Sequence, residues 1–113
     1  MHEVGIAQNI LEVIQKEAEE NNSNEIKKVK LLLGEFTGVV REALEFAFDI
    51  LKKDTLAKDA ELEIETKKLK TYCSVCKKNF NHVSEPNFIC NQCGNALEII
   101  EGREMEIEYI DIN

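Results

Sequence analysis

The sequence contains little proline, little histidine and no long apolar run, and each shortage narrows what the chain can be. Its one proline, Pro86, lies among polar residues that are expected to form a loop, and we find no internal repeat or low-complexity tract. No apolar run approaches the length of a membrane span, and no signal-peptide pattern opens the chain. We therefore expect a cytoplasmic protein of 113 residues, with one compact unit of modest core and a small appended lobe.

Positive charge is also scarce. Lysine and arginine number 14 against 22 aspartates and glutamates, which gives a formal charge of -8 and would repel a nucleic-acid backbone. One local basic cluster flanks the first cysteine pair and is either a solvated collar or a docking patch for an acidic protein; it comprises Lys67, Lys68, Lys70, Lys77 and Lys78. One possible function of this chain is that of a zinc ribbon that binds nucleic acid or protein. We keep it as the alternative function, and the negative charge disfavours nucleic acid as its partner.

Signatures of common catalytic sites are missing as well. The sequence has no nucleotide-binding glycine loop, no His-Glu-x-x-His helix and no nucleophile elbow. We therefore expect no enzyme and assign no catalytic residue.

The clearest pattern present is a set of four cysteines in two Cys-x-x-Cys pairs. Cys73 and Cys76 form the first pair, Cys90 and Cys93 form the second, and Gly94 follows where such a turn often needs a positive φ. Two turns of this kind can direct four sulfurs at one tetrahedral ion, and we interpret them as zinc ligands. Disulfides, buried free thiols or a redox pair are the alternatives. Because four thiolates complete the zinc shell, the ion should stabilise the fold and not catalyse hydrolysis.

Hydrophobic periodicity predicts two helices and three strands outside the cysteine segment. Apolar residues recur at helical spacing up to about Glu20 and again from Val39 to Lys53, with Thr37 as the expected cap of the second helix. Alternating patterns predict strands over residues 26–33, 60–66 and 103–112. The apolar stripe of the second helix, including Phe46 and Ile50, is interpreted as core.

These elements predict an α+β fold, in which a mixed sheet of about three strands is covered by two helices. The strands before and after the cysteines share a one-sided apolar pattern, so we expect them to pair in one sheet with the zinc-ribbon lobe inserted between them. The expected domains are residues 1–70 with 98–113, which form the α/β domain, and residues 71–97, which would bind zinc.

The start of the chain offers a second kind of metal site. The amine of Met1, the amide nitrogen of His2 and its imidazole can close two fused chelate rings, an arrangement that nickel(II) and copper(II) prefer. Glu3 could add a carboxylate. A histidine at this position is otherwise usually part of a mobile terminus. His82, in the cysteine loop, is expected to be a solvated residue and not a ligand.

Taken together, these motifs resemble the HypA/HybF family of hydrogenase maturation proteins. The resemblance extends over the whole chain: Met1-His2-Glu3 precedes a helix, Gly34 closes a strand, and the helix of residues 42–49 and the two cysteine pairs follow in order. It implies a nickel metallochaperone that holds Ni(II) through Met1, His2 and Glu3, with structural zinc on the four cysteines. Val40-Arg41 departs from the acidic residue and proline that many members carry there.

The resemblance also implies partners. Nickel would pass to the precursor of the [NiFe]-hydrogenase large subunit, with a HypB-type GTPase as a second partner, and some members also serve urease. A homodimer is compatible with the resemblance, whereas nucleic acid and membrane are not expected partners.

Overall fold

The computed structural model describes residues 2–81 and 88–113, which fold into two compact units. The first unit contains Met1–Leu32, Gly38–Glu65 and Glu106–Asn113, and the second contains Leu33–Thr37 and Thr66–Met105. Pro86 and His82 lie outside the described residues. Among the residues that are described, no helix has both the length and the apolar character needed to cross a membrane.

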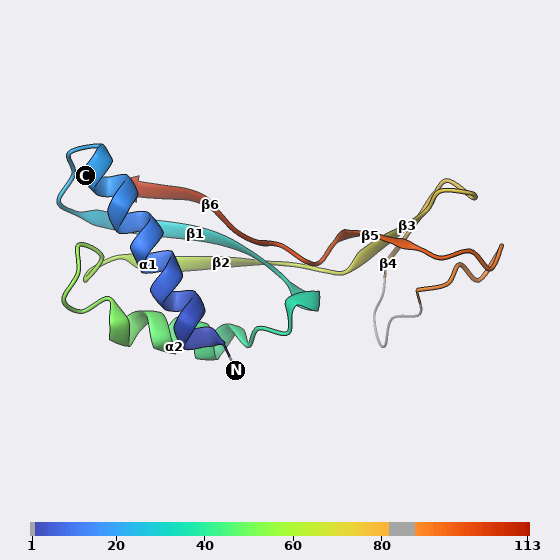
Figure 1. Ribbon diagram of the computed structural model, residues 1–113, viewed down its shortest axis with the longest axis horizontal. Helices are drawn as coiled ribbons and strands as arrows, with labels where there is room; N and C mark the ends of the chain where they lie inside the picture. The colour runs from blue at the N-terminus through green and yellow to red at the C-terminus, as the bar shows by residue number, and fades with distance from the viewer. Residues whose placement is uncertain (1, 82–87) are drawn as a thin grey trace. The chain divides into compact units, whose positions relative to one another are not determined.

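The first unit is a three-stranded sheet with two helices, which confirms the predicted α+β fold. Helix α1 (Glu3–Glu20) leads to strand β1 (Ile26–Gly34), and helix α2 (Arg41–Leu51) leads to strand β2 (Glu61–Lys67), with β6 (Met105–Ile112) last. Figure 1 shows β1 and β2 running in the same direction and β6 running back, so the sheet is mixed.

The core of this unit lies between the helices and the central strand. Its largest fully buried side chains come from α1, β1 and α2; they include Ile14, Ile26, Val29, Leu31, Leu44 and Phe48. These residues follow helical spacing in α1 and α2 and two-residue spacing in most of β1, because only one face of each element meets the core.

The order of strands is β2-β1-β6, so the two strands that flank the cysteine segment share a sheet without being neighbours. Lys30 on β1 connects them: its Nζ lies 3.0 Å from a carboxylate oxygen of Glu65 on β2 and 3.7 Å from one of Glu108 on β6. β6 is an edge strand, and Met105 and Tyr109, which belong to the apolar side of its one-sided pattern, are 38% and 43% exposed.

Helix α2 differs from its prediction in its start and in its burial. It begins at Arg41 after Val40, and the predicted cap is wrong: Thr37 lies in a short 3₁₀ turn (Glu35–Thr37), where its Oγ1 donates to the Gly34 carbonyl at 2.8 Å. The prediction that Phe46 and Ile50 belong to the core is also wrong, since they are 68% and 48% exposed. The helix buries a single narrow face, so its wide apolar stripe exceeds what one packing surface can cover.

The second unit is a small antiparallel sheet with the two cysteine turns. Its strand order is β4-β3-β5, where β3 spans Lys70–Cys73, β4 spans Lys78–Asn81 and β5 spans Glu98–Glu101. It includes more chain than residues 71–97, since it extends over Thr66–Met105 and also contains Leu33–Thr37, the end of β1 with the turn that follows.

Close backbone packing explains why Leu33–Thr37 belongs to the second unit. A Cβ on Gly34 would lie 2.1 Å from the carbonyl oxygen of Gly102, so only glycine fits there. The Phe36 amide donates to the same carbonyl at 2.8 Å, and the Phe36 ring meets the Phe88 ring edge to face, with centroids 5.5 Å apart. The Glu35 carboxylate accepts the Leu69 amide at 2.7 Å.

Candidate metal centres

Two backbone turns of the same design position the four cysteines. In the first, the Lys77 amide donates to the Cys73 carbonyl at 2.7 Å, and in the second, the Gly94 amide donates to the Cys90 carbonyl at 2.8 Å. Gly94 has the positive φ, 76°, that the sequence suggested. Lys77 adopts φ 56° at the matching place, a conformation that is uncommon for a residue with a side chain.

The sulfur atoms lie at the separations that one tetrahedral ion requires. Cys73 Sγ is 3.5 Å from Cys93 Sγ, Cys76 Sγ is 3.9 Å from Cys90 Sγ, and all four sulfurs fall within 4.8 Å of one another. Zinc bound at ~2.3 Å by four thiolates has sulfur separations of about 3.8 Å, so the donor set fits that ion. The four thiols are free, which excludes disulfides in this structure.

Hydrogen bonds make the four thiols unequal. The Asn95 backbone amide and its side-chain Nδ2, which is 3.3 Å from Cys93 Sγ, lower the pKa of Cys93 to about 6. The pKa of Cys76 is raised to about 12; the largest cause is its hydrogen bond with Cys93, and the second is desolvation by burial. Four thiolates this close repel one another, so a cation is needed to hold all of them ionised.

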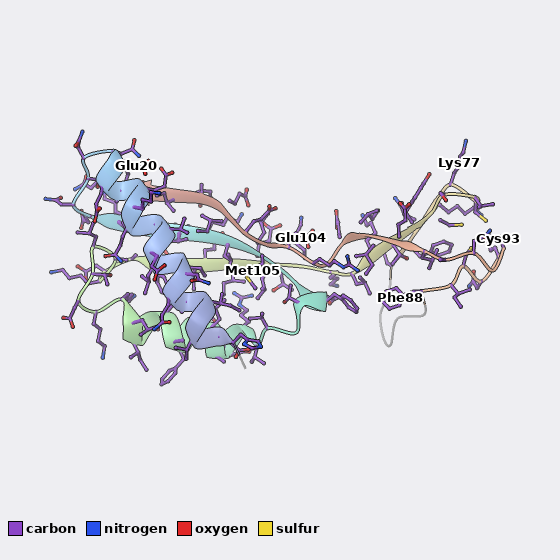
Figure 2. All side chains as sticks on the ribbon, viewed as in Figure 1. Glu20, Lys77, Phe88, Cys93, Glu104 and Met105 are labelled. Atoms are coloured by element: carbon purple, nitrogen blue, oxygen red, sulfur yellow. The ribbon has the colours of Figure 1, made fainter. Side chains whose placement is uncertain are left out.

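The four cysteines differ in burial. Cys73 and Cys90 are 0% and 2% exposed, Cys76 is intermediate, and Cys93 is exposed at the tip of the second unit, where Figure 2 shows it near the end of its turn. In the part of the chain that the structure describes, these cysteines are the one group of three or more metal-ligating side chains that meet.

His2 is exposed and stands directly before α1, where its carbonyl accepts the Ile6 amide at 2.9 Å and so opens the helix. An exposed imidazole next to the chain start can reach an ion without displacing any core residue. Met1, the other predicted nitrogen donor, lies outside the described residues.

Glu3 has a different environment from His2. It is only 7% exposed, and its Oε2 accepts the Val40 backbone amide at 3.0 Å. That amide and the Glu3 backbone amide lower the pKa of the Glu3 carboxyl, because both donate to the ionised form. Sequence reasoning missed Val40, since nothing in its residue type marks an amide donor 37 positions away.

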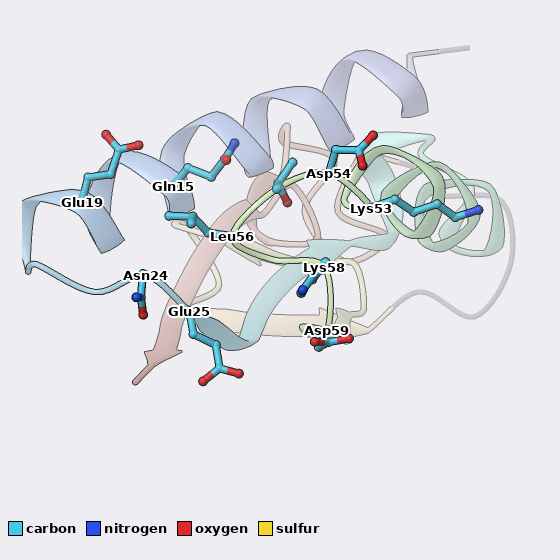
Figure 3. A pocket seen from close by; sticks show the side chains of 10 residues that line it. Gln15, Glu19, Asn24, Glu25, Lys53, Asp54, Leu56, Lys58 and Asp59 are labelled. Carbon is cyan, nitrogen blue, oxygen red and sulfur yellow. The ribbon is translucent and has the colours of Figure 1, made fainter.

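An open hollow on the first unit offers no comparable donor set. It is lined by charges of both signs, among them Glu19, Glu25, Asp54 and Lys58, which point outward from different segments (Figure 3). Mixed exposed charges of this kind are typical of a solvated surface.

The fold and the four-cysteine cluster define a class before they define a family. Four cysteine sulfurs that converge on one point in a small α+β protein indicate a metal-binding protein. Residues 1–112 match the family described as "Hydrogenase/urease nickel incorporation, metallochaperone, hypA". The chain therefore belongs to the HypA family of nickel metallochaperones in hydrogenase maturation.

Individual relatives agree with the family. The hydrogenase maturation factors HypA of Aquifex aeolicus and Moorella thermoacetica are 37% and 36% identical to this chain, and each alignment covers at least 97% of both sequences. Two solution structures share the fold. That of the nickel metallochaperone HypA from Helicobacter pylori has a TM-score of 0.71 at 24% identity and covers 99% of this chain and 97% of its own. A structure described as the HypA protein has a TM-score of 0.76 at 23% identity and covers 100% and 97%.

Proposed function

We propose that this protein carries one Ni(II) at its N-terminus and delivers it to the precursor of the [NiFe]-hydrogenase large subunit, while a structural zinc holds the cysteine unit. The observation that carries this proposal is the separation of two donor sets: four convergent sulfurs in one unit and the exposed His2 in the other. Thiolates suit zinc, whereas amine, amide and imidazole nitrogens suit nickel.

The nickel site consists of Met1, His2 and Glu3. The Met1 amine, the His2 amide and the His2 imidazole supply nitrogens, and Glu3 completes the motif. All of these donors must be unprotonated to bind, so nickel affinity should rise steeply from mildly acidic to mildly alkaline buffer. Release on protonation suits a carrier, which has to surrender its cargo.

The zinc site consists of Cys73, Cys76, Cys90 and Cys93. A zinc ion would neutralise the repulsion of the four thiolates and tie together two turns that have few apolar residues between them. A thiolate centre also requires reduced cysteines, and we therefore place nickel transfer in the cytoplasm.

The partners in this proposal are a HypB-type GTPase and the hydrogenase large-subunit precursor. The names of the HypA relatives support hydrogenase maturation, and the family description supports urease as a further recipient. A homodimer is compatible with the proposal and is not required by either metal site.

Nickel titration of untagged, zinc-loaded protein and of His2→Ala tests the proposal. The native chain should bind one nickel and keep its zinc, whereas His2→Ala should lose nickel binding by at least roughly tenfold with unchanged zinc content, because a chelate ring is removed. A chain with an N-terminal extension is a second test of the same site. It keeps the His2 side chain but blocks the amine, and it should also lose nickel. Undiminished nickel affinity in both variants would refute the terminal site.

A further inference from the structure

We propose that Glu3 is a positioning residue and not a nickel ligand: its carboxylate anchors the nickel-binding terminus to the start of α2 by accepting the Val40 amide. The inference rests on the proposed nickel site and changes the role of one of its residues. It follows from a hydrogen bond of 3.0 Å between two segments that both belong to the first unit.

The burial of Glu3 supports this role. The residue is 7% exposed, whereas His2 beside it is exposed, so the two side chains of the motif face different surroundings. To ligate an ion in solvent through Oε2, the carboxylate would have to give up the Val40 amide, and the side chain would have to turn out of its buried position. Losing a hydrogen bond to an ionised group and losing this packed position both oppose ligation.

The bond also meets a need of α2. Val40 is the N-cap residue of this helix, and its apolar side chain makes no capping hydrogen bond to the first turn. The first amides of a helix lack intrahelical partners, and a carboxylate is well suited to the positive end of the helix dipole. Glu3 supplies that carboxylate from another helix, and α1 and α2 are packed together in the first unit.

Anchoring Glu3 restrains the donors next to it. The His2 carbonyl is held by the Ile6 amide at 2.9 Å, and the Glu3 side chain is held by Val40, so both ends of the His2–Glu3 peptide are fixed. A preorganised peptide loses less conformational freedom when it binds an ion. Groups that orient ligands without touching the metal typically change affinity by roughly tenfold or more.

Two matched pairs of variants separate positioning from ligation. Glu3→Gln keeps an oxygen that can accept the Val40 amide, whereas Glu3→Ala removes it. Val40→Pro removes the amide donor while leaving Glu3 intact, and Val40→Ala keeps the donor. Val40 has φ -84° and ψ 113°, which is close to the backbone conformation of proline.

The measurements are nickel affinity and the nickel d–d absorption spectrum of each untagged, zinc-loaded protein. We expect Glu3→Ala and Val40→Pro to weaken nickel binding by roughly tenfold each, Glu3→Gln and Val40→Ala to bind nearly as tightly as the native chain, and the double change Glu3→Ala with Val40→Pro to be no worse than either alone. The spectrum should keep its band positions in Glu3→Gln, because the coordinating atoms do not change.

A carboxylate ligand would give the opposite pattern. Glu3→Gln would then shift the spectrum and weaken binding as much as Glu3→Ala, and Val40→Pro would have no effect, which would overturn the inference. Circular dichroism and zinc content report folding, and if Val40→Pro does not fold, the Glu3→Gln and Glu3→Ala pair decides the question. Failure of the native chain to bind nickel would instead defeat the proposed function itself.

Discussion

Cys93 and Glu3 show how hydrogen-bond donors set the chemistry of a side chain. Asn95 donates to the Cys93 sulfur from its backbone and from its side chain, and the pKa of Cys93 falls to about 6. Val40 donates to the Glu3 carboxylate and lowers its pKa. In both cases the donor stabilises the ionised form, which for a thiolate is also the form that binds metal.

Asn95→Ala should make zinc easier to remove by acid. The substitution deletes the side-chain donor but keeps the backbone one, so the Cys93 pKa rises part of the way toward its ordinary value. Protons then compete with zinc at higher pH, and the midpoint of release should move to higher pH, with up to about tenfold weaker zinc at neutral pH. A chromogenic zinc indicator measures release across a pH series.

Asn91→Ala is the control for that experiment, because Asn91 is an exposed residue of the same turn. Equal release midpoints for Asn95→Ala and the native chain would show that the side-chain donor does not matter.

At the scale of residues, spacing alone predicted which cysteines meet. Two Cys-x-x-Cys turns can supply four ligands to one ion only if all four sulfurs point to the same place, and the four sulfurs do converge. The bond from Glu3 to Val40 could not be predicted, since neither residue type nor periodicity links positions 37 apart. The positive φ of Lys77 could not be predicted either. The turn requires this backbone conformation, but the residue at that position is lysine and not the glycine that usually signals it.

At the scale of elements, helix α2 has two apolar faces and buries only one. Phe48 is 0% exposed and Lys52 Nζ lies 5.8 Å from the centre of its ring, whereas Phe46 is 68% exposed. The two phenylalanines are two residues apart and therefore point to different sides of the helix.

Phe48→Ala and Phe46→Ala should differ sharply in stability. Truncating the buried ring should lower the free energy of unfolding by about 3–5 kcal/mol, while truncating the exposed ring should cost less than about 1 kcal/mol. Denaturant titration of the zinc-loaded proteins checks this, and each variant is the other's control. Similar losses in the two variants would mean that Phe46 packs in the core after all.

Periodicity placed every helix and strand of the first unit but did not reveal the order of its strands. Alternation shows which face of a strand is apolar, not which strand lies beside it. Charge does carry a signal for strand order: β1 has lysines where β2 and β6 have glutamates, and Lys30 lies between Glu65 and Glu108. A basic strand flanked by two acidic ones is the arrangement that this pattern favours.

The boundary of the second unit was hidden for a similar reason. Gly34 approaches the backbone of Gly102 so closely that a side chain at position 34 has no room, and this contact accompanies the assignment of the end of β1 to the cysteine unit. Composition marks neither glycine as a partner of the other, so the sequence did not predict that residues 33–37 join the cysteine unit.

For the whole molecule, acidic charge and two separate donor sets are the governing features. A formal charge of -8 disfavours binding to nucleic acid, although many zinc ribbons bind it, and it suits a protein that collects cations. The four cysteines belong to the second unit and the exposed His2 belongs to the first, so the proposed function gives each ion its own set of ligands.

X-ray absorption at the nickel and zinc edges of one sample tests this division most directly. Untagged protein loaded with one zinc and one nickel should show nickel surrounded by nitrogen and oxygen, with no sulfur neighbour, and zinc surrounded by four sulfurs at ~2.3 Å. Sulfur in the nickel shell, or loss of zinc as nickel binds, would contradict the account.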